Sequence, residues 1–153
     1  MIKTTSSAQT KKIAKLLAQE ILSAKFPRKS ALVLALSGDL GAGKTTFVQG
    51  FLCGAGIRKK ITSPTFVLIK NYELGIKNYG NYKKIYHIDC YRIYKPKDIL
   101  STGIKEILNN PENIVLIEWP ERIGRILPKT AIVIKLKYGK KENERIIIIK
   151  FKK

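Results

Sequence analysis

One stretch constrains the fold of this chain more than any other: Gly38-Asp39-Leu40-Gly41-Ala42-Gly43-Lys44-Thr45-Thr46. It fits the phosphate-binding loop (P-loop) pattern G-x-x-x-x-G-K-[ST] at every specified position. Residues 31–36 before it form an unbroken apolar run, which is typical of a strand buried on both faces of a parallel sheet. Residues 45–52 after it can continue as a helix. The motif therefore lies in the strand, loop and helix setting that it requires.

The residue types in this loop predict how it would hold a phosphate. Gly38, Gly41 and Gly43 allow positive φ angles and a close approach of the backbone to a ligand. The backbone N–H groups at the start of the following helix then converge on the phosphate, helped by the helix dipole. Lys44 would reach the outer phosphates as a point charge, and the hydroxyl of Thr45 would complete a Mg2+ shell. We expect nucleotide binding, with Lys44 facing solvent in the loop and not lying in the core.

Length and composition limit the remaining possibilities. A chain of 153 residues is expected to form one domain, residues 1–153, with a sizeable core. Cys53 and Cys90 lie far apart in the sequence, and they are expected to be buried thiols of a reducing compartment. The N-terminus lacks the apolar core of a signal peptide, and no apolar run approaches a membrane span. We expect a cytoplasmic protein that does not contact a membrane.

The charge of the chain is strongly basic, with 30 Lys and Arg against 11 Asp and Glu and a formal net charge of +19. Such a charge can indicate contact with RNA or another polyanion. The lysines are spread along the chain, which is also rich in Ile, Asn and Tyr. This spread favours a compositional bias, although both explanations stay open at this point.

Apolar periodicity predicts an α/β fold. An amphipathic helix follows the capping residues 5–7, carries its apolar positions at Ile13, Leu16, Leu17 and Ile21, and ends near Pro27. A second helix follows Pro96 and includes Ile99 to Leu108. The predicted strands are 31–37, 66–72, 84–89, 113–119, 131–138 and 145–151, the last two forming an antiparallel hairpin at one side of the sheet. Together these elements predict a three-layer P-loop NTPase-like sandwich with a mostly parallel sheet and a C-terminal antiparallel hairpin.

Two acidic residues end predicted strands. Glu118 follows the apolar run 114–117, which is the Walker B form, an acid beside the P-loop that holds or orders Mg2+ and water. Asp89 ends the strand 84–89. Ligands of open α/β sheets bind at these strand ends, so we expect both acids at the site. The segment Ser63-Pro64-Thr65 enters another strand, where it fits equally well a switch loop sensing the outer phosphate or an ordinary turn.

Four motifs in this order carry a resemblance to a known family. They are the P-loop 38–46, Thr62-Ser63-Pro64-Thr65-Phe66, His87-Ile88-Asp89-Cys90-Tyr91-Arg92 and Glu118-Trp119-Pro120-Glu121-Arg122. The chain resembles, over almost its whole length, the TsaE (YjeE) family, small bacterial P-loop ATPases of tRNA threonylcarbamoyladenosine (t6A) biosynthesis. Cys90 departs from the Leu usual in the family, a small apolar replacement that puts little in doubt.

The resemblance implies a function that spacing alone does not give. Members bind ATP with Mg2+, hydrolyse it slowly and join the TsaB–TsaD pair, which transfers a threonylcarbamoyl group to adenosine 37 of tRNA. Contact with tRNA is then indirect, and the basic charge leaves direct contact open. The implied nucleotide-binding residues are Gly41, Ala42, Gly43, Lys44, Thr45, Thr46 and Trp119. The implied metal ligands are Thr45, Asp89 and Glu118, and the implied catalytic residues are Glu118 and Thr65.

Other interpretations stay open from the residues themselves. A small nucleotide or metabolite kinase would also need the P-loop, although the chain shows no arginine-rich lid and no insertion for a second substrate. A basic RNA-binding module with a vestigial P-loop is the non-enzymatic alternative. His87 is expected to be a packed strand residue, because no cluster of metal ligands surrounds it in the sequence. Trp119 could be either a core residue or a neighbour of the nucleotide.

Overall fold

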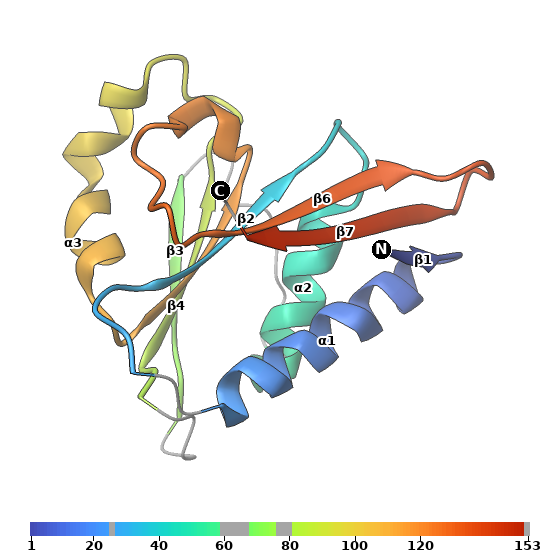
Figure 1. The fold of residues 1–153 in the computed structure, drawn as a ribbon, viewed down its shortest axis with the longest axis horizontal. Helices are drawn as coiled ribbons and strands as arrows, with labels where there is room; N and C mark the ends of the chain where they lie inside the picture. Colours follow the sequence, from blue (N-terminus) through green and yellow to red (C-terminus); the bar gives the residue numbers. More distant parts are fainter. Residues whose placement is uncertain (25–26, 59–67, 76–80, 152–153) are drawn as a thin grey trace.

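A computed structural model describes residues 1–24, 27–58, 68–75 and 81–151 of the chain. The described residues form one seven-stranded sheet in the order β1-β7-β6-β2-β5-β4-β3 (Figure 1). Its strands are β1 (Ile2–Thr4), β2 (Leu32–Ser37), β3 (Ile69–Glu73), β4 (Lys84–Asp89), β5 (Asn113–Glu118), β6 (Ile132–Tyr138) and β7 (Arg145–Phe151). The helices are α1 (Ser7–Ser23), α2 (Lys44–Gly54) and α3 (Ile104–Asn109), with 3-10 helices η1 (Pro96–Thr102) and η2 (Pro120–Ile123).

The centre of the sheet is parallel and its flanks are antiparallel. β2 pairs in parallel with β5 on one side and with β6 on the other, and β5 pairs in parallel with β4. The β6–β7 and β3–β4 pairs are antiparallel. Every residue of β5 is buried, as the continuous apolar run 114–117 predicts. The predicted mostly parallel sheet with a C-terminal antiparallel hairpin is therefore confirmed.

Helices cover both faces of the sheet and make the fold three-layered (Figure 1). α1 and α2 lie on one face, over a core that includes Leu34, Leu36, Leu116 and Phe47. η1, α3 and η2 lie over the opposite face, where a second core forms. Alternate residues of each central strand enter alternate cores, because side chains along a strand point to opposite faces. The three-layer sandwich predicted from the sequence is confirmed. No helix of the described residues is long and apolar enough to span a membrane.

Several sequence predictions about local structure need correction. The predicted single helix after Pro96 is two elements, η1 and α3, because Gly103 between them adopts a left-handed φ of 78° that interrupts a regular helix. The hairpin strand β7 is not the sheet edge along its whole length, since the short strand β1, which was not predicted, pairs with residues 145–147. Cys90 is buried as expected, but Cys53 is exposed.

Three of the four apolar positions predicted for α1, Ile13, Leu17 and Ile21, pack against the core, and the prediction is wrong for Leu16. Leu16 is 48% exposed, while the buried positions are Thr10, Ala14, Ala18 and Leu22. These positions are spaced by four residues, and the first three are small. Small residues are needed there because α2 approaches α1 at two glycines, Gly50 and Gly54. Helix contact, and not side-chain hydrophobicity alone, decides which face of α1 is buried.

This close approach gives a prediction for Gly50→Ala. A Cβ at Gly50 would lie 2.4 Å from the backbone oxygen of Lys11, so the two helices would have to separate. The better helix propensity of Ala does not offset this clash, and we expect a loss of about 1–3 kcal/mol in the free energy of unfolding. Urea denaturation followed by circular dichroism measures it. Gly75→Ala is the control, because a Cβ at Gly75 would meet nothing within 4 Å. Equal stability of the two variants would contradict the proposed helix contact.

Candidate functional site

The P-loop runs from the end of β2 into the first turn of α2. Gly38, Gly41 and Gly43 have φ angles of 143°, 75° and 100°, and the last two lie in the left-handed region that favours glycine. Gly43 caps α2, so the N-terminus of that helix opens directly from the loop. This geometry presents backbone N–H groups and the positive end of a helix dipole, which suits a phosphate.

The β6–β7 hairpin holds the P-loop from outside the motif. The hydroxyl of Tyr138 donates a hydrogen bond of 2.6 Å to the backbone oxygen of Leu40. Arg145 donates to the backbone oxygen of Gly41 at 3.2 Å, and its guanidinium lies 4.5 Å from the centre of the Tyr138 ring. Neither Tyr138 nor Arg145 was predicted, because about a hundred residues separate them from the loop. No local pattern in the sequence signals these contacts.

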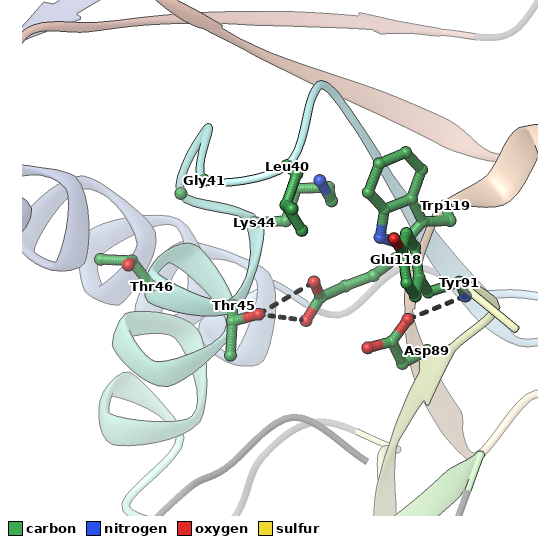
Figure 2. Close-up of a pocket in the computed structure, with 10 residues that line it drawn as sticks. Leu40, Gly41, Lys44, Thr45, Thr46, Asp89, Tyr91, Glu118 and Trp119 are labelled. Carbon is green, nitrogen blue, oxygen red and sulfur yellow. Dashed lines mark hydrogen bonds between the residues drawn. The ribbon is translucent and has the colours of Figure 1, made fainter. Parts of the chain in front are cut away.

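Sheet register places the two strand-end acids beside the loop. Glu118 is directly opposite Leu36 on β2 and opposite Asp89 on β4, so both acids lie at the carboxyl end of the parallel strands. Glu118 is 2% exposed and Asp89 is 4% exposed. The structure thus brings together Asp89, Glu118 and the P-loop, and it confirms that β5 is the strand next to β2 (Figure 2).

Both acids are fixed by hydrogen bonds. The hydroxyl of Thr45, in the first turn of α2, lies 3.0 Å from each carboxylate oxygen of Glu118 (Figure 2). The Nε2 atom of His87 lies 2.8 Å from Oε1 of the same carboxylate. Asp89 accepts a hydrogen bond of 2.9 Å from the backbone N–H of Tyr91. His87 is wholly buried, as expected of a packed strand residue, but its bond to Glu118 was not foreseen.

Lys44 is buried in the loop, and the expectation that it faces solvent is wrong. It is 5% exposed, and its ammonium donates to the backbone oxygens of Gly38 and Asp39 at 2.7 and 2.8 Å. The ammonium also lies 3.9 Å from the centre of the Trp119 ring, a cation–π contact. Burial lowers the pKa of Lys44 from its usual value, and nearby carboxylates, Glu118 foremost, act in the opposite direction. The side chain of Lys44 turns back onto the loop, because these two backbone oxygens are close enough to accept its hydrogen bonds.

Trp119 is half-buried: it packs against the second core and also lines the cavity beside the P-loop, so both interpretations of it stay open. It adopts a left-handed conformation with φ 57° and ψ 50°, which is uncommon for a bulky residue. The turn directs its ring over Lys44 and to within 5.1 Å of the Tyr91 ring centre. A strained backbone of this kind costs on the order of 1–3 kcal/mol and is found most often at functional sites.

A cavity of about 360 Å3 opens between these groups (Figure 2). Its lining residues are Leu40, Gly41, Gly43, Lys44, Thr45, Thr46, Asp89, Tyr91, Glu118 and Trp119. Ala42 is in the loop but points into the core, so it contributes only its backbone. Thr65, with the whole Ser-Pro-Thr segment, lies outside the described residues. Sequence-predicted residues thus line most of the cavity, while Leu40 and Tyr91 were not predicted.

A second cavity of about 350 Å3 is lined in part by the same loop. It shares Gly41, Gly43 and Thr46 with the first cavity. The remaining lining residues are polar and come from the start of α1 and the β7 hairpin: Thr5, Ser6, Ser7, Thr10, Asn143 and Arg145. The P-loop therefore lines both a cavity that contains two carboxylates and a cavity that is rich in hydroxyl groups.

The donor set fits a magnesium ion that is shared with phosphates. Within the described residues, no group of three or more His, Cys, Asp or Glu side chains is arranged to hold a metal by itself. Mg2+ in phosphate-transfer sites takes one or two carboxylates, a hydroxyl, waters and the substrate's own phosphates. Thr45, Asp89 and Glu118 line one cavity and supply such a hydroxyl and two carboxylates.

Comparison with known proteins agrees with the fold and the motifs. The family model "Threonylcarbamoyl adenosine biosynthesis protein TsaE" matches residues 4–147. The tRNA threonylcarbamoyladenosine biosynthesis protein TsaE of Bacillus subtilis is 38% identical over 135 residues, 88% of this chain and 75% of that protein. The protein of the same name from Haemophilus influenzae is 38% identical over 114 residues, 74% of this chain and 68% of that protein.

A solved structure shows the same architecture. The crystal structure of Bacillus subtilis YdiB superposes with a TM-score of 0.73 and 32% sequence identity, covering 99% of this chain and 84% of that one. The matched region of the family model includes the P-loop and the strand-end acids Asp89 and Glu118. The chain belongs to the TsaE family of threonylcarbamoyladenosine biosynthesis proteins.

Proposed function

We propose that this chain is the Mg2+-dependent ATP-binding and slowly hydrolysing subunit of the t6A machinery, acting with a TsaB–TsaD complex. Family membership supports the role in t6A biosynthesis. The single observation that carries the ATPase proposal is the cavity in which Lys44, Thr45 and Glu118 meet at the N-terminus of α2. A positive loop facing two carboxylates is the arrangement that a phosphate with a bound divalent cation requires.

Each group has a separate task in this proposal. The backbone of the P-loop and Lys44 bind the phosphates, and Lys44 exchanges its contacts to Gly38 and Asp39 for phosphate oxygens. Thr45, Asp89 and Glu118 would hold Mg2+, which neutralises charge on the phosphates when bound. Glu118 also orients the attacking water in this proposal, since its side chain is one methylene longer than that of Asp89.

The second cavity suits the nucleoside end of ATP. Thr46 lines both cavities, so a phosphate chain that follows the loop can pass from one to the other. Hydroxyl groups and the amide of Asn143 could then meet the ribose and base. This places the reacting phosphate beside Glu118 and the nucleoside near Arg145.

Calorimetry with ATP, with and without Mg2+, tests the proposed ligand. We expect saturable binding that needs Mg2+, slow release of phosphate, and capture of TsaB and TsaD counterparts that differs with and without ATP. No ATP binding at millimolar concentration would overturn the ATPase role while leaving family membership intact. Transfer of labelled phosphate to a small-molecule acceptor would instead favour a kinase.

A separate observation bears on direct contact with tRNA. One face of the β6–β7 hairpin, the lysine face, comprises Val133, Lys135, Lys137, Ile146, Ile148 and Lys150. Register pairs Lys137 with Ile146, Lys135 with Ile148 and Val133 with Lys150, and paired residues project to the same side of a sheet. None of the six belongs to either core, and all three lysines are exposed. Among the described residues these lysines form no ion pair. Such a face fits a phosphate backbone.

We expect the triple variant K135Q/K137Q/K150Q to bind tRNA more weakly, with a shallower salt dependence. Each lost phosphate contact lowers the slope of log K against log salt by about 0.7–0.9, so the three together lower it by about 2–3. Gel shifts at rising salt measure the slope. The control K12Q/K15Q/K105Q removes the same charge from exposed positions on α1 and α3. An equal effect of both triples, or no binding by the parent, would leave compositional bias as the explanation of the basic charge.

A further inference from the structure

His87 is the only histidine of the chain, and its side chain is wholly buried beside Glu118. His87 is opposite Leu116 on the neighbouring strand, and Asp89 is opposite Glu118. His87 therefore lies two residues before the end of β4, and its side chain is on the face of the sheet that α2 covers. Its Nε2 atom reaches diagonally to Oε1 of Glu118 at 2.8 Å. Two parallel strands thus fix this contact by register alone.

The hydrogen-bond partners define which nitrogen carries the proton. A carboxylate can only accept hydrogen bonds, so Nε2 of His87 must be the donor. Nδ1 is buried, and within the described part of the chain it has no hydrogen-bond partner. A second N–H at that position would be buried without an acceptor, which is costly. The geometry therefore assigns the hydrogen bond to Glu118 to the Nε2–H of His87.

His87 does not line either cavity beside the P-loop, so it acts on the site only through Glu118. Among the described residues, the side chain of Thr45 also bonds to the Glu118 carboxylate; Thr45 lines the cavity and is proposed to give its hydroxyl to Mg2+. The bond from Thr45 is therefore open to exchange when ligands bind. The bond from His87 lies behind the carboxylate and is sheltered from that exchange.

We propose that His87 is a positioning residue that holds the Glu118 carboxylate in its working orientation through the Nε2–H bond. The proposal rests on the ATPase function proposed above. His87 fixes one oxygen of Glu118, while the Thr45 hydroxyl lies 3.0 Å from each of the two oxygens. The bond from His87 therefore restricts the rotamers of the glutamate side chain. Loss of such an outer partner typically costs 10–100-fold in activity or metal affinity.

The variants His87→Leu and His87→Gln separate positioning from packing. Leucine fills space but cannot donate, and it leaves Oε1 of Glu118 without this partner, whereas glutamine can present an amide N–H. We expect His87→Leu to lower kcat by about 10–100-fold with KM changed less than threefold, and His87→Gln to recover most of the loss. Ile85→Val is the control, because it trims a buried residue of the same strand and face that does not touch Glu118.

A nitrogen-15 NMR spectrum gives a readout that does not depend on activity, and the single histidine makes its assignment unambiguous. We expect the parent to show the Nε2–H tautomer and Glu118→Ala to show a mixture of tautomers. A tautomer mixture in the folded parent, or a kcat of His87→Leu equal to that of Ile85→Val, would overturn the proposal. A parent that shows the Nε2–H tautomer but hydrolyses no ATP would instead overturn the ATPase function and this role with it.

Discussion

Glu118→Gln is expected to keep ATP binding and to lose about 100-fold or more of ATP hydrolysis. The substitution preserves shape and the ability to contact Thr45, since each oxygen of Glu118 lies 3.0 Å from the Thr45 hydroxyl. It removes the negative charge that we propose orders and polarises water in the transition state. Proton-transfer catalysis by a positioned side chain typically contributes 10²–10⁴-fold. The loss should therefore fall on kcat and much less on the dissociation constant.

Asp89→Asn is the matched comparison, because it makes the same chemical change on the neighbouring strand. Asp89 is directly opposite Glu118 in the sheet, but its carboxylate accepts a hydrogen bond from the backbone of Tyr91 and its side chain is shorter. We expect Asp89→Asn to weaken Mg2+-dependent ATP binding as well as turnover. Single-turnover hydrolysis and calorimetric titration of both variants measure the difference. Hydrolysis by Glu118→Gln at the parent rate would make Glu118 a structural residue.

The central sheet could be predicted from the sequence because its signals are local. The run 114–117 is apolar at every position, and the structure buries all of it on β5. The P-loop could be predicted because its glycines, its lysine and its hydroxyl residue all lie within nine consecutive residues. The positive φ angles of Gly41 and Gly43 confirm the predicted loop geometry. The place of Glu118 at the end of β5 follows from the same run.

The remaining features depend on contacts between distant residues. The strand β1 is three residues long, too short for periodicity, and pairing with β7 is what makes it a strand. The His87–Glu118 bond joins residues 31 apart, and the Tyr138–Leu40 bond joins residues 98 apart. Sheet register creates the first contact, and the second joins the end of β6 to the P-loop; a single sequence encodes neither pairing in a readable pattern. The close approach of α1 to Gly50 and Gly54 of α2 was not predicted for the same reason, since it joins two helices.

The second prediction concerns Lys44→Ala. The burial of Lys44 changes the physical reason for this prediction but not the expected direction of the effect. Its ammonium is bonded to Gly38 and Asp39 and lies over the Trp119 ring, so Lys44→Ala removes contacts within the loop as well as the cation that meets phosphate. These contacts are confined to the loop and its neighbour Trp119. The two cores do not include Lys44. We therefore expect the variant to fold.

Lys44→Ala is expected to weaken ATP affinity by about 100-fold, because the phosphates would lose a cation that lines the proposed site and is itself 5% exposed. Calorimetry with ATP and Mg2+ measures the affinity, and circular dichroism checks the fold. Lys140→Ala is the control for net charge, since it removes the same charge from the exposed β6–β7 turn. If both variants bind ATP as the parent does, the proposed phosphate contact of Lys44 is wrong. If both bind equally weakly, ATP responds to the overall charge of the chain, and the structure of the P-loop does not explain the affinity.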